Sequence, residues 1–517
     1  MNEFGYDSCI SKGACSVNPR TSSLILIIVI YLKIISKYAL DIFKQNKLSD
    51  SVKELILNAS SLIVQSQEIT EQVFLNLISE FKNKLPLTIE EYKKIFKEDC
   101  FKDEDIQNSD LFTKCNNITD SIKFGEKIFK TTLLNIPENI RDLHQIMLVL
   151  AKSLSINLTD YESLNSEFND AFEQILKLLS SINPDIENEK EIIEIIIKSA
   201  IINKDLMLKI RERQEELYGT QKLKKVSYST FPSKAILVAG SNIRELEFIL
   251  ESMKDSDIDI YTHDGMMLAH TFPKFSEYKN LKGQYGQGGE NCLIDFATFP
   301  GPIILTKNSL HNIENLYRGR LFTTDKNIPK GVIYIKDNDY SEVLKSAETA
   351  KGFKSGKNCE SAYIGYDYEK TLLLIKEKVK NLNCKKIVLI GLEKYSIEQK
   401  SYFDKLIRTL PKTTLIISFS YNSEKENLLH LNTCFDSTPL LKIYEEIKNY
   451  NLPITVFMPT CDRNTISQMI YFSQNKNTRV FVGKCTPIIL NPSLMTTLEK
   501  DFNIKSITTV SKDVAIN

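Results

Sequence analysis

Residues 235–261 read AILVAGSNIRELEFILESMKDSDIDIY, and the two ends of this stretch, residues 235–239 and 258–261, are short apolar runs. Apolar runs of this length on either side of a helix-length segment are typical of buried strands joined by a crossover helix. The alternation recurs further along the chain, with apolar runs at residues 303–305, 332–335, 387–390, 415–417, 454–458 and 480–482. This part of the sequence therefore predicts α/β domains with mostly parallel sheets.

The residues before Lys225 follow a helical pattern instead. One apolar face repeats with i, i+3, i+4 spacing at Val52, Leu55, Ile56, Ala59, Leu62 and Ile63. Ser51 and Glu54 have the spacing of a capping box at a helix start. We therefore predict a multidomain α and α/β protein. An N-terminal helical bundle at residues 1–225 precedes two Rossmann-like parallel-sheet domains at residues 226–375 and 376–517.

Charge and hydropathy limit the partners of the chain. Its 517 residues contain 66 Lys and Arg against 66 Asp and Glu, so no net field attracts nucleic acid or an anionic membrane. The most apolar run, residues 24–32 (LILIIVIYL), ends at Lys33 and is too short for a membrane span, which needs about 20 residues. We expect a buried helix there, no nucleic-acid or membrane partner, and a cytoplasmic protein.

The ten cysteines are too few for a disulfide scaffold in a chain of this length, and no CxxC pair occurs. We therefore expect reduced thiols, and the absence of CxxC argues against zinc ribbons and bacterial ferredoxin clusters.

Residues 261–270, YTHDGMMLAH, resemble the YTHGEMLPAH segment of the hybrid-cluster family, also called the prismane or hydroxylamine reductase family. Matching segments continue in order through KGQYG (282–286), FPG (299–301), TKNSL (306–310), YRGRLFTT (317–324) and residues 483–492. Near the N-terminus, Cys9 and Cys15 resemble the second half of the family's four-cysteine motif. The chain is identified as a member of this family, to which the carbon monoxide dehydrogenases are related in architecture.

The resemblance implies a helical domain and two Rossmann-like domains, with a simple four-iron cluster near the N-terminus. It also implies a hybrid cluster where the three domains meet, held in the family by a histidine, two glutamates and four cysteines. Carried over by position, these seven ligands fall at Ser241, Gly265, Ser309, Glu393, Tyr421, Cys434 and Asp462. Only the cysteine at 434 is kept and one glutamate has become aspartate, so a hybrid cluster is not expected.

The family scaffold implies that these seven positions still converge at one point. We expect Tyr421 to fill part of the former cluster space, with its hydroxyl bonded to Glu393 or Asp462. His263 and His270, kept from the family motif, are expected to hydrogen-bond loops and not to act as acid or base.

Two sets of residues remain candidates for metal binding. Cys434, Asp462 and Glu393, with Cys461 and Cys485 nearby, follow predicted strands and would suit one residual metal ion. The alternative is that these cysteines are small buried apolar residues.

Cys9 and Cys15 are only two thiolates. A four-iron cluster there would be shared between the subunits of a homodimer, as in carbon monoxide dehydrogenases. The alternative is a loop left over from a lost cluster.

Two functions stay open at this point, and so does whether the chain is an enzyme. In the first, a diverged family protein lacks hybrid-cluster catalysis and keeps an iron–sulfur electron-transfer site served by a redox partner protein. In the second, an active oxidoreductase reduces small nitrogen species, hydroxylamine or nitric oxide, at a remodelled metal site.

Overall fold

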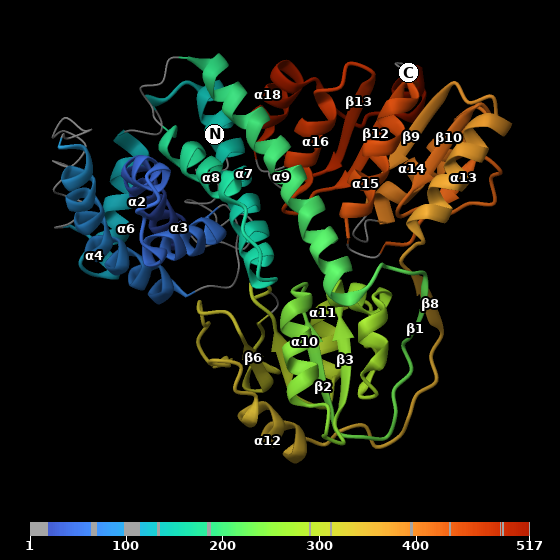
Figure 1. The fold of residues 1–517 in the computed structure, drawn as a ribbon, viewed down its shortest axis with the longest axis horizontal. Helices are drawn as coiled ribbons and strands as arrows, with labels where there is room; N and C mark the ends of the chain where they lie inside the picture. The colour runs from blue at the N-terminus through green and yellow to red at the C-terminus, as the bar shows by residue number, and fades with distance from the viewer. Residues whose placement is uncertain are drawn as a thin grey trace. The chain divides into compact units, whose positions relative to one another are not determined.

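The structure is a computed structural model that describes residues 19–63, 70–97, 114–131, 135–182, 188–288, 291–310, 313–392, 397–433, 436–485, 488 and 491–515. The chain divides into two compact units. The first comprises residues 1–207, 461–474 and 484–505, and the second comprises residues 208–460, 475–483 and 506–517. Figure 1 shows the helices and strands of both units along the chain.

The first unit is helical. Its helices are α2 (Pro19–Lys44), α3 (Asp50–Leu62), α4 (Glu71–Phe96), α6 (Ile118–Thr131), α7 (Glu138–Ser163), α8 (Asn169–Ser180), the first part of α9 (Glu189–Tyr218), α16 (Thr465–Ser473) and α18 (Pro492–Phe502). Helix α2 packs against α4, α6 and α8, and α7 packs against α16 and α18. The two C-terminal helices thus belong to the core of the helical unit.

The apolar run at residues 24–32 forms the middle of α2. Leu24, Ile27, Ile28, Tyr31 and Leu32 are all fully buried. Helix α2 is long and apolar enough to cross a membrane, but about two thirds of its most apolar window is buried inside the structure. A helix that is buried to this extent is typical of the core of a helical bundle.

The first large sheet lies in the second unit and has the strand order β4-β3-β2-β5-β6-β7, with every pairing parallel. Its strands are β2 (Ala235–Ala239), β3 (Asp259–His263), β4 (Leu281–Gln284), β5 (Ile303–Leu305), β6 (Leu321–Thr323) and β7 (Ile333–Tyr334). The connecting helices are α10 (Ile243–Ser252), α11 (Cys292–Thr298) and α12 (Ser341–Thr349). The strand order reverses between β2 and β5, which is where doubly wound sheets place their sites.

The second large sheet has the order β11-β10-β9-β12-β13-β14 and reverses between β9 and β12. Its strands are β9 (Lys386–Ile390), β10 (Thr414–Ser418), β11 (Leu428–His430), β12 (Ile454–Thr460), β13 (Thr478–Lys484) and β14 (Ile504–Ser506). The accompanying helices of the second unit are α13 (Tyr368–Asn381), α14 (Ile397–Thr409), α15 (Thr438–Ile447) and α19 (Val510–Ala515). An antiparallel ribbon of β1 (Lys224–Ser227) and β8 (Ser361–Ile364) completes the strands.

These elements confirm the predicted fold class of a helical N-terminal region followed by two parallel-sheet α/β domains. Among the described residues the first strand begins at Lys224, and neither large sheet crosses residue 375. The boundary expected at residue 375 lies inside α13, and α16 and α18 pack with the helical unit although they lie within residues 376–517. The three domain ranges therefore remain predictions.

Candidate functional site

Three of the positions predicted for lost cluster ligands lie together at the point where the first sheet reverses. Ser241 follows β2, Gly265 follows β3 and Ser309 follows β5. A Cβ atom on Gly265 would lie 3.1 Å from the Gly240 carbonyl oxygen and 3.4 Å from Ser241 Cβ. Gly240 has φ +129°, and a Cβ atom there would overlap the hydroxyls of Thr306 and Ser309. A side chain at Gly265, where the resemblance places a family glutamate, would therefore be in tight contact with the backbone after β2.

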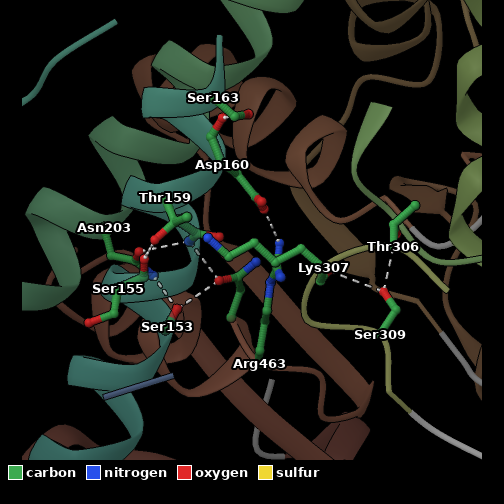
Figure 2. A network of polar contacts seen from close by, with 12 residues as sticks. Ser153, Ser155, Thr159, Asp160, Ser163, Asn203, Thr306, Lys307, Ser309 and Arg463 are labelled. Atoms are coloured by element: carbon green, nitrogen blue, oxygen red, sulfur yellow. Dashed lines mark hydrogen bonds and ion pairs between the residues drawn. The ribbon is translucent and has the colours of Figure 1, made fainter. Parts of the chain in front are cut away.

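The hydroxyls in this group bond to the protein itself. Thr306 Oγ1 donates to the Ala239 carbonyl oxygen at 3.3 Å. Ser309 Oγ lies 3.5 Å from Thr306 Oγ1 and 3.5 Å from the Lys307 carbonyl oxygen, and Figure 2 shows these contacts. A serine hydroxyl with local partners is a poor substitute for a thiolate toward iron.

Two carboxylates that the sequence did not single out hold the loop after β5. Glu245 Oε2 accepts from the Lys307 backbone N–H at 3.0 Å and from Thr324 Oγ1 at 2.6 Å. Asp325 Oδ2 accepts from the backbone N–H of Asn308 at 2.9 Å, and Asn308 has φ +61°. The loop is fixed by charge-assisted hydrogen bonds, so Ser309 is held in one position.

The two family histidines are also hydrogen-bonded. His263 is fully buried and its Nε2 lies 3.0 Å from Asp295 Oδ2, which also accepts from two backbone N–H groups, those of Gln287 and Gly288. His270 Nε2 lies 2.9 Å from Thr262 Oγ1, and burial lowers its pKa to about 4. His270 is therefore neutral at physiological pH.

Cys292 lies near this region but is not an available thiolate. Burial, with the negative charges of Asp264 and Asp295, raises the pKa of its thiol to about 12. The thiol stays protonated at neutral pH, which disfavours both metal binding and nucleophilic attack.

Tyr421 belongs to the hydrophobic core of the second sheet. It follows β10, and its ring stacks on Phe403 with centroids 4.8 Å apart. Its backbone N–H donates to Ser418 Oγ at 2.8 Å. Packing accounts for the position of this ring, whereas the predicted hydroxyl bond to Glu393 or Asp462 remains a prediction.

Asp462 holds the turn directly before α16. Its Oδ1 accepts from the Asn464 backbone N–H at 2.7 Å and from Thr465 Oγ1 at 3.0 Å. The Asp462 backbone N–H donates to Thr465 Oγ1 at 2.8 Å. The N-cap residue of α16 is Asn464. The Asp462 carboxylate therefore has local hydrogen bonds of its own in this turn.

Cys461 and Cys485 form a disulfide with their Cα atoms 4.8 Å apart. The expectation that all thiols are reduced is wrong for this pair. Cys461 directly follows β12 and Cys485 directly follows β13, and these strands are neighbours in the sheet, so their carboxyl ends lie side by side. As a disulfide, neither sulfur is a metal donor.

A buried polar cluster in the helical unit contacts the segment after Asp462. We call it the amide cluster; its members are Ser153, Asn157, Asn203, Asn464 and Ser467, all at most 7% exposed. Asn464 Oδ1 accepts from Ser153 Oγ at 2.7 Å and from Asn157 Nδ2 at 2.9 Å. Asn203 Nδ2 donates to Ser153 Oγ at 2.9 Å and to Ser467 Oγ at 3.0 Å.

An ion pair and a buried amine lie beside this cluster. Arg463 Nη2 pairs with Asp160 Oδ2 at 3.0 Å, and Figure 2 shows the two side chains pointing toward one another. Lys152, in α7, is 7% exposed; burial and the nearby Arg463 lower its pKa to about 7. These residues were not predicted from the sequence. The feature that could have indicated them is the presence of polar side chains on both sides of a long helix with an apolar pattern.

The remaining predicted site residues, Cys9, Cys15, Glu393 and Cys434, lie outside the described residues. Within the part of the chain that the structure describes, no group of three or more His, Cys, Asp or Glu is arranged to hold a metal ion. The residual site built on Cys434, Asp462 and Glu393 therefore stays a prediction.

The described positions do not fit the family's hybrid cluster. Ser241, Gly265 and Ser309 supply one glycine and two hydroxyls in close contact, and Tyr421 supplies a core ring. Iron in such a cluster needs thiolate, imidazole or carboxylate donors, and none of these four positions provides one.

Comparison with known proteins gives long but distant matches. A hydroxylamine reductase of Methanocella arvoryzae is 22% identical and covers 98% of this chain and 97% of its own length. The hydroxylamine reductase of Kosmotoga olearia is 26% identical, with 73% of each chain covered. That of Clostridium novyi is 24% identical, with 99% of this chain and 97% of the relative covered.

Among solved structures, one described as "NiZn[Fe4S4] and NiNi[Fe4S4] clusters in closed and open alpha subunits of acetyl-CoA synthase/carbon monoxide dehydrogenase" matches with a TM-score of 0.49. It is 10% identical, and the match covers 98% of this chain and 83% of that one. Residues 6–515 match the Prismane/CO dehydrogenase family, which confirms the resemblance carried by the segment at 261–270. The chain therefore belongs to the Prismane/CO dehydrogenase family.

Proposed function

We propose that this chain is a diverged hydroxylamine reductase-like protein that lacks hybrid-cluster catalysis and keeps an iron–sulfur electron-transfer site at Cys9 and Cys15. The packing around Gly265 carries the first half of the proposal. The position offers no donor atom, and the Gly240 carbonyl and Ser241 lie against it. A Cβ atom restored there would lie 3.1 Å from the Gly240 carbonyl oxygen, so the backbone after β2 would have to shift by a few tenths of an ångström.

The neighbouring positions support the same conclusion. Ser309 lies in the loop after β5, and hydrogen bonds from this loop to Glu245 and Asp325 hold the loop in place. Asp462, which could still offer a carboxylate, uses Oδ1 to hold the turn directly before α16. Residues that once would have held iron now have hydrogen bonds or packing contacts of their own, as buried polar groups without a metal require.

The electron-transfer half rests on the two N-terminal cysteines and on family membership. Four thiolates are needed for a four-iron cluster, and Cys9 and Cys15 supply two per chain. A homodimer sharing one 4Fe-4S cluster would supply the rest. Such a cluster would exchange electrons with a redox partner protein in the cytoplasm.

Hydroxylamine turnover tests the loss of catalysis. Anaerobically purified protein, given reduced methyl viologen as electron donor, is expected to form no ammonium from hydroxylamine above a protein-free blank. A family hydroxylamine reductase assayed alongside shows that the assay works. Turnover well above the blank would overturn the proposal and favour an active oxidoreductase of small nitrogen species with a remodelled metal site.

A further inference from the structure

The disulfide between Cys461 and Cys485 joins two strand ends that the sheet already holds together. Strands β12 and β13 are neighbours in the second sheet, so their pairing does not depend on the covalent bond. Cys485 is fully buried, whereas Cys461 is partly exposed. The bond can therefore be approached from the Cys461 side.

Within the described part of the chain, Cys115, Cys292, Cys359 and Cys384 form no disulfide. Cys359 and Cys384 are partly exposed and still unpaired. Disulfides of cytosolic proteins are usually redox-active and not structural, and the cytoplasm is the compartment proposed for this protein.

The three residues after Cys461 connect this bond to helices of the helical unit. Asp462 holds the turn directly before α16. Arg463 pairs with Asp160 in α7. Asn464 accepts two hydrogen bonds from α7 through the amide cluster. Arg463 and Asn464 thus link Cys461 to contacts on α7.

We propose that Cys461 and Cys485 are a redox-active pair, reduced by a dithiol protein or a small dithiol, whose bond holds residues 461–464 in place against α7. The proposal is independent of any iron–sulfur site.

The exchange balances without further reactants. A thiolate of the reductant attacks Cys461 Sγ and forms a mixed disulfide, and Cys485 leaves as a thiolate that takes up a proton. The second thiol of the reductant then attacks the mixed disulfide, frees Cys461 and leaves the reductant oxidised. Two electrons pass to the protein, one S–S bond breaks and one forms.

The first test is differential alkylation of the full-length protein. The native protein is treated anaerobically with diamide or with dithiothreitol, quenched with acid, freed of reagent and then unfolded for labelling with N-ethylmaleimide, because Cys485 is fully buried. Cys461 and Cys485 are expected to stay unlabelled after diamide and to label after dithiothreitol. Renewed diamide treatment should reverse this. Labelling of Cys384 should be the same in both states. The proposal would be overturned if dithiothreitol reduced the disulfide only after the protein unfolds. It would also be overturned if diamide did not oxidise the two thiols back to a disulfide.

The second test follows amide hydrogen exchange in wild-type protein in both redox states. Reduction is expected to increase the exchange rate in residues 461–467 and 153–160 by about tenfold. Without the covalent bond, these segments open locally at a lower free-energy cost. Cys461→Ser should exchange at the reduced rate under either treatment, whereas Cys384→Ser should respond like the wild type. Equal exchange of the oxidised and reduced wild-type protein in both segments would refute the link to α7 whether or not the variant folds.

Discussion

Replacing Cys9 by serine is expected to remove the iron of the proposed shared cluster and to convert the proposed homodimer into monomers. A four-iron cluster needs four thiolates, and one chain provides Cys9 and Cys15 at the N-terminus. Loss of one thiolate per chain leaves two for the shared cluster, which is too few to hold it. Iron content and molecular mass in solution, measured anaerobically, check both effects.

Cys359→Ser is the matched control for this experiment, because Cys359 is a free, partly exposed cysteine in the second unit. Its iron content and mass should equal those of the wild type. A Cys9→Ser protein that keeps its iron, or that stays dimeric after losing it, would show that the cluster does not bridge two subunits.

Replacing Lys152 by methionine is expected to stabilise the protein at pH 7. Lys152 is buried, and desolvation together with Arg463 lowers its pKa from 10.5 to about 7. Folding at neutral pH therefore removes a proton or buries a charge, and either is unfavourable. Methionine has a similar shape and no charge, so the free energy of unfolding should rise by on the order of 2–4 kcal/mol.

The pH dependence has a definite sign. Between about pH 7 and pH 10.5 the unfolded chain binds a proton on Lys152 that the folded chain has lost, so wild-type stability rises with pH across this window. Lys152→Met should show a shallower rise. Lys177→Met, which removes a surface lysine paired with Glu173, is the control and should change stability by less than about 0.5 kcal/mol. Urea unfolding at several pH values measures all three proteins, and a destabilised Lys152→Met would contradict the prediction.

The alternation of apolar runs was enough to predict the two sheets because their central strands are buried on both faces. β2 and β10 are buried along their whole length, which gives the apolar runs that the sequence shows at residues 235–239 and 415–417. The strands that the sequence did not reveal include β4, β11 and β14, each an edge strand of three or four residues. Short edge strands carry polar residues and leave little pattern to read.

The candidate site was harder to predict because the role of each residue depends on contacts with residues that are distant in the sequence. The sequence showed that Gly265 carries no donor, but not that Ser241 and the Gly240 carbonyl lie against it. Asp462 was kept as a metal candidate because its hydrogen bonds depend on the geometry of the turn directly before α16.

The disulfide was missed for the same kind of reason. Cys461 and Cys485 are separated by 24 residues, and only the strand order places them together. Ser153, Asn157 and Asn203 form the amide cluster with residues far along the chain, so their partners could not be inferred from helical periodicity.

Iron and acid-labile sulfide per chain, measured on anaerobically purified protein, test the central claim that the scaffold is kept while the hybrid cluster is lost. We expect about two iron atoms per chain, which corresponds to one four-iron cluster per dimer. A second iron–sulfur cluster is not expected, because Ser241, Gly265, Ser309 and Tyr421 cannot hold it. About eight iron atoms per chain, with the spectroscopic signature of a hybrid cluster, would contradict it.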